Sequence, residues 1–480
     1  MDLKEILDNG LKQEPVSKLS RREALKLMGI SPIAAGVLAG AGSGTATEAQ
    51  ASDAKGRIVI VGGGAGGIMA MARLHRALSN PDITLIAPNE KHLYQPGQVF
   101  MAAGEYTFDD IVKDNRDFIP DDVKWIKDEV KTFDPDNNKV ITRAGEEIGY
   151  DYLVVAAGLQ YHYEWIEGLS AEMIGKNGIS SVYLNNPEAG TADGGSITWE
   201  WFNDLKAAAK SGKPKVICTQ PDTAIKCGGA PQKILYLSDD FLKRDGLTAD
   251  FAFATPGSNL FGVPEVNKTL VEEVQPRYGN ITNKFGHNLV AVDAEKKVAT
   301  FEHKYEVQGD YDEDLEEYEM ITKVDRVDMP YDFLHVVPPM SAPDAVADSP
   351  LGWQKGSGKG WLEVDQYTLQ HRRYPNVFGI GDVCGIPKGK TGGSARHHGP
   401  IMVGNLIAQM EGKELKEKFD GYTVCPLKTQ YGKIILAEFN YEGAAPSFPL
   451  AVGEQRWVWW AFDLYMLKPM YWYLMMRGLM

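Results

Sequence analysis

Cysteine is scarce in this chain, and no cluster of metal ligands accompanies it. Four of the 480 residues are cysteines: Cys218, Cys227, Cys384 and Cys425. No two of them form a CxxC pair, and the chain has no HExxH motif, so the pattern predicts no structural metal site. Four cysteines can form three complete disulfide pairings, and their spacing alone chooses none of them.

Basic residues are too few for a nucleic-acid-binding protein. The chain has 50 Lys and Arg against 65 Asp and Glu, a formal net charge of −15, whereas phosphate recognition needs a basic face. Part of the acidity is local, because residues 306–328 are rich in Asp and Glu and are typical of a solvated hairpin or excursion. The length and the 44% hydrophobic content suffice for two or three domains with cores.

The first 51 residues have the features of an export signal. Two arginines, Arg21 and Arg22, precede a Gly- and Ala-rich apolar run at 30–42 and a small-x-small cleavage pattern, AQA, at 49–51. The alternative is a short amphipathic helix with an accidental arginine pair. We favour a twin-arginine signal peptide, which places the mature chain, beginning near Ser52, outside the cytoplasm, where disulfides can persist.

A dinucleotide-binding fingerprint follows directly. Residues 56–78 predict a buried strand, a glycine turn and an amphipathic helix, and the turn fits GxGxxG with Gly62, Gly64 and Gly67. The first glycine permits the tight turn, the second lets the backbone approach a pyrophosphate, and the third lets helix and strand pack closely. The positive end of the helix then faces the anion.

The next two strands extend this site. An acidic residue at the end of the second strand should hold the adenosine ribose. Ala87 stands at the usual position, so we expect Glu90, three residues later, to take this role. The segment YDYLVVAAGLQ (150–160) resembles the strand and glycine crossing of flavoproteins with two dinucleotide-binding domains, with Gly158 at the turn.

A third segment indicates a flavin. NVFGIGDVCGIPKGKTGG (376–393) resembles the second flavin motif of those proteins, a strand that ends in Gly381 and Asp382. Asp382 is expected to accept hydrogen bonds from the ribityl hydroxyls. Lys390 and a helix that starts near Thr391 are expected to stabilise negative charge on the reduced ring. Three such segments in this order predict FAD as the cofactor.

The middle of the chain lacks a second glycine fingerprint. The strand KPKVICTQ (213–220) precedes residues 221–242, which contain no GxGxxG, although the helix at 232–244 is intact. The phosphate cradle is therefore missing, and NADH is not the expected reductant. The turn carries Cys227 instead.

These observations give an α/β fold with two Rossmann-like dinucleotide-binding domains, similar to disulfide reductase-like flavoproteins, followed by C-terminal amphipathic helices. The expected boundaries are a signal peptide at 1–51, FAD-binding parts at 52–168 and 341–420, a second Rossmann-like domain at 169–340 and a C-terminal membrane-anchoring segment at 421–480.

Two cysteines are expected to be redox-active. Cys384 follows Asp382 by two positions, beside the expected isoalloxazine, and Cys227 precedes a helix with Lys226 adjacent, a setting that favours a thiolate. The alternative is that both are small apolar core residues. Cys218, on a buried strand, is expected to be inert. Cys425, in a predicted loop, receives no role.

Four longer segments resemble the sulfide:quinone oxidoreductase family, closest to its mitochondrial-type branch. They are KCGGAPQKILYLSD (226–239), HVVPPMSAPD (335–344), TLQHRRYPNVFGIGD (368–382) and FDGYTVCPLKTQYGKIILAEFNY (419–441). The resemblance implies a flavoprotein that oxidises sulfide with two cysteines and FAD and passes electrons to quinone, with residues 421–480 on the quinone side.

The resemblance also implies roles for single residues. Cys227 matches the family cysteine that carries persulfide sulfur, and Cys384 stands one residue beyond the second family cysteine because Val383 intervenes. HS⁻ would attack a Cys227–Cys384 disulfide, Cys227 would keep the sulfur, and Cys384 would donate to the flavin. The persulfide would then pass to a sulfur acceptor. His397 and His398 stand on the following helix as unassigned proton donors.

The aromatic C-terminal tail, residues 456–480, is expected to bind a membrane surface without crossing it. No run approaches about 18 uncharged residues. Two short helices in the interface, with tryptophans at headgroup level, fit better. The alternative is a domain core or a dimer contact. With the export signal, this predicts a peripheral protein on the periplasmic face of the cytoplasmic membrane, in an oligomeric state the sequence does not define.

Three other functions stay open. The flavin subunit of a flavocytochrome c-type sulfide dehydrogenase would pass electrons to a cytochrome and would not need the aromatic tail. An NADH:quinone reductase would need the missing fingerprint. A non-catalytic flavoprotein or persulfide carrier would bind FAD that sulfide fails to reduce.

Overall fold

A computed structural model describes residues 51–185, 193–312 and 317–480. The predicted signal peptide, apart from Ala51, lies outside the described residues. Ser52, the first residue after the predicted cleavage pattern, is held by its backbone N–H, which donates to the carbonyl of Ala77 at 2.8 Å.

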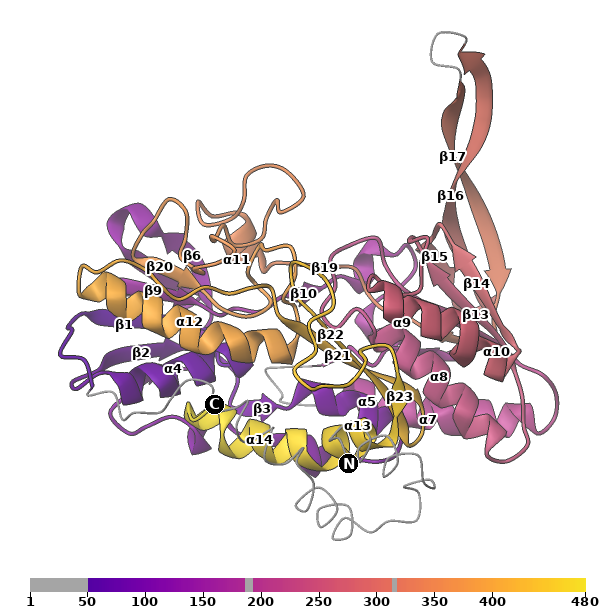
Figure 1. The fold of residues 1–480 in the computed structure, drawn as a ribbon, viewed down its shortest axis with the longest axis horizontal. Helices are drawn as coiled ribbons and strands as arrows, with labels where there is room; N and C mark the ends of the chain where they lie inside the picture. The colour runs from indigo at the N-terminus through magenta and orange to yellow at the C-terminus, as the bar shows by residue number, and fades with distance from the viewer. Residues whose placement is uncertain (1–50, 186–192, 313–316) are drawn as a thin grey trace.

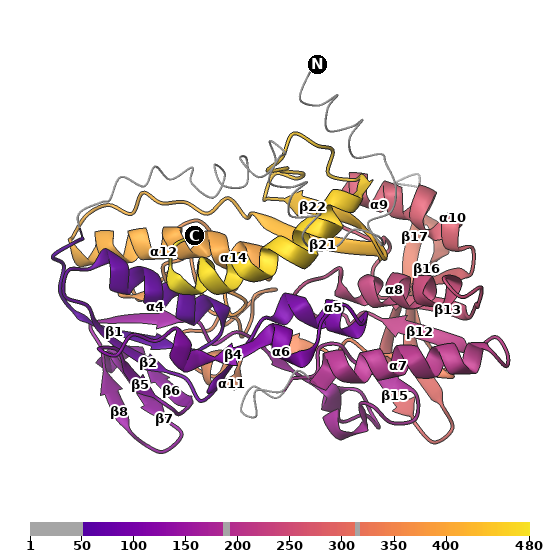
Figure 2. The ribbon, with the colours of Figure 1, turned by 90° about the horizontal axis from the view of Figure 1, so that it is seen from below.

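The first of two parallel sheets is built from both flavin-motif regions, as the sequence predicts (Figure 1). All its strand pairs are parallel. In spatial order the strands are β20 (Val377–Gly379), β9 (Tyr152–Val155), β1 (Arg57–Val61), β2 (Asp82–Ile86) and β5 (Lys124–Ile126). Helices α4 (Ala65–Ala77) and α12 (Gly392–Met410) cover one face, and β6 (Val130–Asp134), β7 (Lys139–Thr142) and β8 (Glu147–Gly149) cover the other (Figure 2).

Strand β1 shows why this sheet is buried on both faces. Side chains alternate along a strand, so Ile58 and Ile60 join the core beneath α4, while Val59 and Val61 join the core beneath β6–β8. A continuous β-branched run satisfies both faces, which is the pattern of a covered parallel sheet.

The second parallel sheet is formed by the middle of the chain. Its order is β11 (Ile179–Ser180), β18 (Phe333–His335), β12 (Lys215–Thr219), β13 (Asp250–Thr255) and β14 (Ile281–Phe285). Two long helices, α7 (Asp193–Ala209) and α8 (Ala230–Lys243), pack against it, and α7 also contacts α5 (Gln98–Ala102). The strand β12 and the helix α8 stand where the sequence predicts a strand and a helix without a phosphate loop.

The acidic segment forms a projecting hairpin, as the sequence predicts. Strands β16 (Val298–Asp312) and β17 (Glu317–Pro330) pair antiparallel along their length, and only the base of β16 also pairs with β15 (His287–Asp293). Figure 1 shows this arm extending away from the rest of the molecule.

Shorter elements complete the fold. They are β3 (Lys91–Leu93), β4 (Val112–Asp114), β10 (Gln160–Tyr161), β19 (Met340–Ser341), α6 (Phe108–Ile111), α9 (Pro264–Thr269), α10 (Gln275–Tyr278) and α11 (Asp344–Ala347).

The C-terminal region adds a hairpin and a helical tail. Strands β21 (Thr423–Gln430) and β22 (Lys433–Phe439) pair antiparallel, and β23 (Gln455–Arg456) joins β22. The tail runs through α13 (Trp457–Phe462), a π-helical turn η8 (Asp463–Leu467) and α14 (Lys468–Tyr473). Figure 2 shows it lying across the molecule beside α4 and the β21–β22 hairpin.

The tail packs differently from the sequence prediction. Trp459, Trp460 and Trp472 are each at most 4% exposed and belong to the main hydrophobic core. These tryptophans therefore fill the protein interior and are not available at headgroup level. Within the described ranges no helix combines the length and apolarity that crossing a membrane requires.

Candidate functional site

The glycine turn between β1 and α4 leaves no room for side chains at two positions. A Cβ on Gly67 would lie 1.8 Å from the carbonyl oxygen of Gly62, and a Cβ on Gly62 would lie 2.3 Å from that of Ala156. Gly62 also has φ +114°, a conformation that favours glycine. A Cβ on Gly64 would meet nothing within 4 Å, because this residue borders an open cavity.

That cavity, of about 590 Å³, is lined by residues from every flavin motif. Gly158 and Gly381 border it as Gly64 does, and a side chain on either would enter open space. Both have positive φ, +70° and +80°. Gly64, Gly158 and Gly381 therefore expose backbone without side chains along one cavity, so a dinucleotide can approach closely. The residues present fit FAD.

Asp382, Lys390 and Thr391 line the same cavity. Burial raises the pKa of Asp382, against the opposing effect of Lys226 and Lys390. The Lys390 Nζ donates to the carbonyl oxygens of Asp382 at 2.6 Å and Cys384 at 2.9 Å, and burial lowers its pKa to about 8. Thr391 caps α12, its Oγ1 accepting from the Ser394 N–H at 3.1 Å, so the helix begins at the cavity as the sequence predicts.

The two histidines of α12 are held neutral. Burial lowers the pKa of His398 to about 3 and that of His397 to about 4. The His398 Nδ1 accepts from the Gly381 N–H at 3.1 Å, and its Nε2 has no hydrogen-bond partner among the described residues. His398 therefore supports the Gly-Asp turn, while His397 lines the cavity and stacks on Tyr422.

Glu90 lies apart from this cavity. Its side chain is exposed and paired with Lys127, and it is not among the lining residues. The structure does not bring Glu90 to the cavity wall. Its contact with the adenosine ribose stays a prediction.

Cys227 occupies a strained turn between β12 and α8. Its φ is +50°, in the left-handed region that a residue with a side chain rarely adopts. The turn is fixed at both ends, because the Cys227 N–H donates to the Lys390 carbonyl at 2.9 Å and the Ala230 N–H donates to the Cys227 carbonyl at 2.7 Å. These bonds hold the backbone of Cys227 against the flavin loop, and Cys227 lines the cavity.

The thiol that meets Cys227 belongs to Cys425. The Cys425 thiol hydrogen-bonds to the Cys227 sulfur, and this bond lowers the pKa of Cys227 well below that of a free thiol and raises that of Cys425. A Cβ on Gly229 would lie 2.6 Å from the Cys425 Sγ, so only glycine leaves room for it. Cys425 lies in strand β21, whereas the sequence predicted a loop without a role.

A buried ammonium completes the pair. The Lys233 Nζ lies 3.1 Å from the Cys227 Sγ, one turn into α8, and is 3% exposed as a residue. Burial alone would lower the pKa of Lys233, but the two cysteines raise it overall, so it stays charged. The sequence predicts that Lys226 favours the Cys227 thiolate. In the structure Lys226 instead donates to Gln95 and lies over the Tyr161 ring.

The structure corrects the expected partnership of Cys227 and Cys384. Cys384 is 1% exposed and packs in a separate core with Leu362 and Val364, and burial raises its pKa to about 12. It lies beside the Gly-Asp turn, but its backbone carbonyl, not its thiol, contacts Lys390. Val383 is also buried in that core. Cys218 is fully buried on β12, in keeping with an inert role.

The hairpin that carries Cys425 has two faces. Cys425 and Leu427 point towards Gly229 at the start of α8. The opposite face presents Val424 paired with Glu438 and Pro426 paired with Leu436, and all four of these line the cavity together with Lys428. Alternation along β21 thus places the thiol on one side of the strand and an amine on the other.

The cavity becomes apolar towards the tail. Its wall there consists of Phe448, Phe462, Leu467, Met470, Met475 and Met480. Within this wall a buried ion pair joins the hairpin to η8, because the Lys428 Nζ lies 2.6 Å from the Asp463 Oδ2, with both side chains 3% exposed. Burial lowers the pKa of Lys428, and Asp463 opposes that shift.

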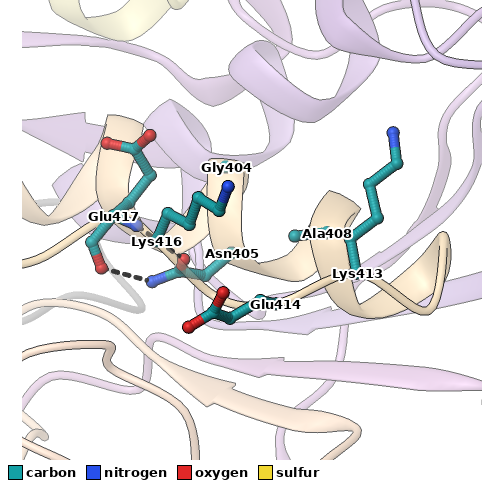
Figure 3. A pocket seen from close by; sticks show the side chains of 7 residues that line it. All are labelled: Gly404, Asn405, Ala408, Lys413, Glu414, Lys416 and Glu417. Carbon is teal, nitrogen blue, oxygen red and sulfur yellow. Dashed lines mark hydrogen bonds between the residues drawn. The ribbon is translucent and has the colours of Figure 1, made fainter.

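A second cavity, of about 440 Å³, lies where α12 ends (Figure 3). The Asn405 side chain donates to the Glu417 carbonyl at 2.8 Å and accepts from the Glu417 N–H at 3.1 Å. The Asn405 amide is therefore bonded to the backbone of the loop that follows α12, and we assign this cavity no chemical role.

Replacing Lys233 with methionine is expected to raise the pKa of Cys227 by about one to three units, because an adjacent positive charge is removed. Because the pKa of Cys227 is depressed in the wild type, its thiolate persists and is alkylated as the pH falls. In the variant, alkylation of Cys227 should stop at a higher pH than in the wild type. The measurement is the iodoacetamide rate at Cys227 against pH, read by peptide mass spectrometry. Lys226→Met is the matched control and should leave the profile in place. An unchanged profile in Lys233→Met would contradict the assignment.

The chain matches known proteins across these elements. A family model described as pyridine nucleotide-disulphide oxidoreductase matches residues 56–185. The chain is 37% identical to the mitochondrial sulfide:quinone oxidoreductase of Dictyostelium discoideum, over 88% of this chain and 86% of that protein, and 35% identical to the one from Mus musculus over the same shares. The solved sulfide:quinone oxidoreductase from Aquifex aeolicus shares the fold, with a TM-score of 0.67 and 21% identity over 88% of this chain and 92% of that one.

These findings confirm the predicted cofactor and enzyme class. The family model covers the glycine turn and the first flavin strands, and the relatives match most of the chain. FAD is the cofactor of this chain. By identity across most of its length, the chain belongs to the sulfide:quinone oxidoreductase family.

Proposed function

We propose that this protein oxidises sulfide with the Cys227–Cys425 pair and FAD and transfers the electrons to a quinone. The observation that carries this proposal is a hydrogen-bonded thiol pair beside a buried ammonium, in which Cys227 and Lys233 lie on the wall of the cavity that the flavin motifs line. A low-pKa thiolate is the nucleophile and leaving group that sulfur exchange requires.

The sulfur steps balance with these two cysteines. In the oxidised protein HS⁻ attacks the Cys227–Cys425 disulfide. The bond between the cysteines breaks, a new S–S bond forms on Cys227 as a persulfide, and Cys425 leaves as a thiolate. A nucleophilic acceptor then removes the outer sulfur and leaves Cys227 as a thiol. The dithiol closes to the disulfide again and gives up two electrons.

The protein positions these steps around the flavin site. When bound, FAD supplies the acceptor for the two electrons released by the dithiol. Lys233 holds Cys227 as thiolate, and Lys390 places an ammonium at the flavin loop, where it favours an anionic reduced ring. The apolar wall towards the tail suits a quinone.

The location of the protein is part of the proposal. We place it on the outer face of a bacterial or archaeal cytoplasmic membrane, exported by its twin-arginine segment. Although Trp459, Trp460 and Trp472 are buried, Tyr473 and Leu479 at the end of the tail are 57% and 51% exposed, and the apolar end of the cavity lies against this tail. A membrane surface on that side would let a lipid-soluble quinone reach the cavity.

An anaerobic titration tests the proposal. Sulfide added to the purified protein should bleach the flavin absorbance, and decylubiquinone should restore it. NADH should leave the spectrum unchanged, because the β12–α8 turn lacks a phosphate cradle. A flavin that stays oxidised when sulfide is added would contradict the proposal. Bleaching of the flavin by NADH would favour an NADH:quinone reductase. Reoxidation by a cytochrome but not by quinone would favour the flavocytochrome c-type function.

A further inference from the structure

Three carboxylates line the cavity, and one of them has no charged partner. Asp382 stands at the flavin loop near Lys226 and Lys390, and Asp463 is paired with Lys428. Glu438, on β22, forms no salt bridge among the described residues, although its side chain lines an apolar wall and the residue is 3% exposed. Burying a carboxyl group without a cation is costly unless hydrogen bonds replace water, so its partners are informative.

Glu438 is held by two hydrogen bonds. The Tyr422 hydroxyl donates to its Oε1 at 2.5 Å, and the Ser447 N–H donates to its Oε2 at 3.1 Å. These contacts orient the carboxyl group on the cavity face of the hairpin, beside Leu436 and across from Val424.

A chain of hydroxyls leads from Glu438 to the surface. The Ser447 Oγ donates to the Tyr422 hydroxyl at 3.4 Å, and Ser447 is exposed to solvent. Tyr422 stacks on His397, with ring centroids 4.0 Å apart, and is buried. Solvent, Ser447, Tyr422 and Glu438 thus form a sequence of exchangeable groups that ends inside the apolar cavity.

Resting on the proposed function, we infer that Glu438 delivers a proton to the bound quinone. Reduction of a quinone to a quinol takes two electrons and two protons. FAD, when bound and reduced, would supply the electron pair with one proton, and Glu438 supplies the second proton to a quinone oxygen. Glu438 then regains a proton from solvent through Tyr422 and Ser447. Among the described lining residues it is the one carboxyl group that neither pairs with a lysine nor lies at the flavin loop.

The inference is tested on the quinone step alone. Glu438→Gln keeps the size of the side chain but has no acidic proton to give. The flavin is first reduced with dithionite, and its reoxidation by decylubiquinone is followed in a stopped-flow instrument. We expect reoxidation to slow by about 100-fold or more, the usual contribution of a general acid. The wild type should show a solvent deuterium isotope effect on this step that the variant lacks.

Controls separate proton transfer from folding and from the proposed function. Glu442→Gln, at an exposed position just past the same strand, should reoxidise at the wild-type rate. Tyr422→Phe interrupts the hydroxyl chain and should slow reoxidation by about tenfold, which keeps the inference testable if Glu438→Gln loses FAD. Reduction with dithionite bypasses sulfide, so failure of sulfide to bleach the wild type would count against the proposed function only. Reoxidation of Glu438→Gln within about threefold of wild type would overturn the inference.

Discussion

Cys425→Ser is expected to abolish reduction of the flavin by sulfide, by at least about 1,000-fold, whereas Cys384→Ser should leave it within a small factor of wild type. The reason is placement, because Cys425 hydrogen-bonds to Cys227 while Cys384 packs in a separate core. Cys227→Ser should match Cys425→Ser, since two residues that act as one unit lose their function together. The measurement is the rate of flavin bleaching under anaerobic sulfide.

The three variants also control one another. Cys384→Ser and Cys425→Ser each exchange sulfur for oxygen in a buried thiol, so a general packing defect would appear in Cys384→Ser as well. FAD content, read from the visible spectrum before sulfide is added, confirms that each variant is folded. If Cys384→Ser were inactive and Cys425→Ser active, the pairing seen in the structure would be the wrong one.

Breaking the buried ion pair between the hairpin and the tail should strongly destabilise the protein. Lys428→Met leaves Asp463 charged and unpaired at a site where both residues are 2% exposed. We expect the free energy of unfolding to fall by about 3–5 kcal/mol, because one buried charge loses its partner. Denaturant unfolding of the FAD-loaded protein measures this effect.

A double variant distinguishes pairing from packing. Lys428→Met combined with Asp463→Leu removes both charges and should recover most of the loss, since apolar side chains of similar volume replace a buried pair well. Lys413→Met breaks the exposed pair with Glu411, 2.7 Å apart, and should cost less than about 1 kcal/mol. Equal stability of Lys428→Met and wild type would mean that the pair contributes nothing.

The parts of the fold that depend on local sequence could be predicted. A Cβ on Gly62 or Gly67 would collide with a backbone carbonyl, Gly64 borders the open cavity, and the GxGxxG pattern that marks all three is visible in the sequence. Strands β1 and β12 are continuous apolar runs, which both faces of a covered sheet demand. The acidic hairpin followed from its charge, because a segment so acidic cannot form a core.

The cysteine partner depended on tertiary contacts and could not be predicted from spacing. Cys227 and Cys425 are far apart in the chain, and the sequence predicts a loop at Cys425. The structure instead shows a strand in which Thr423, Cys425, Leu427 and Thr429 are buried, and of the residues between them only Lys428 is buried as well. Similarly, Lys226 is adjacent to Cys227 in sequence, yet Lys233, one helical turn into α8, carries the charge to the sulfur.

The two faces of the β21–β22 hairpin make its register a functional requirement. Inserting one residue into β21 ahead of Cys425 would turn every following side chain to the opposite face. The Cys425 thiol would then turn from α8 towards the cavity, and Lys428, which pairs with Asp463 in the tail, would point at α8. The alternation of one strand therefore sets the partners of both residues, around a single cavity that Cys227 and Glu438 also line. A point substitution changes one face of the strand, whereas an insertion or deletion exchanges both faces at once.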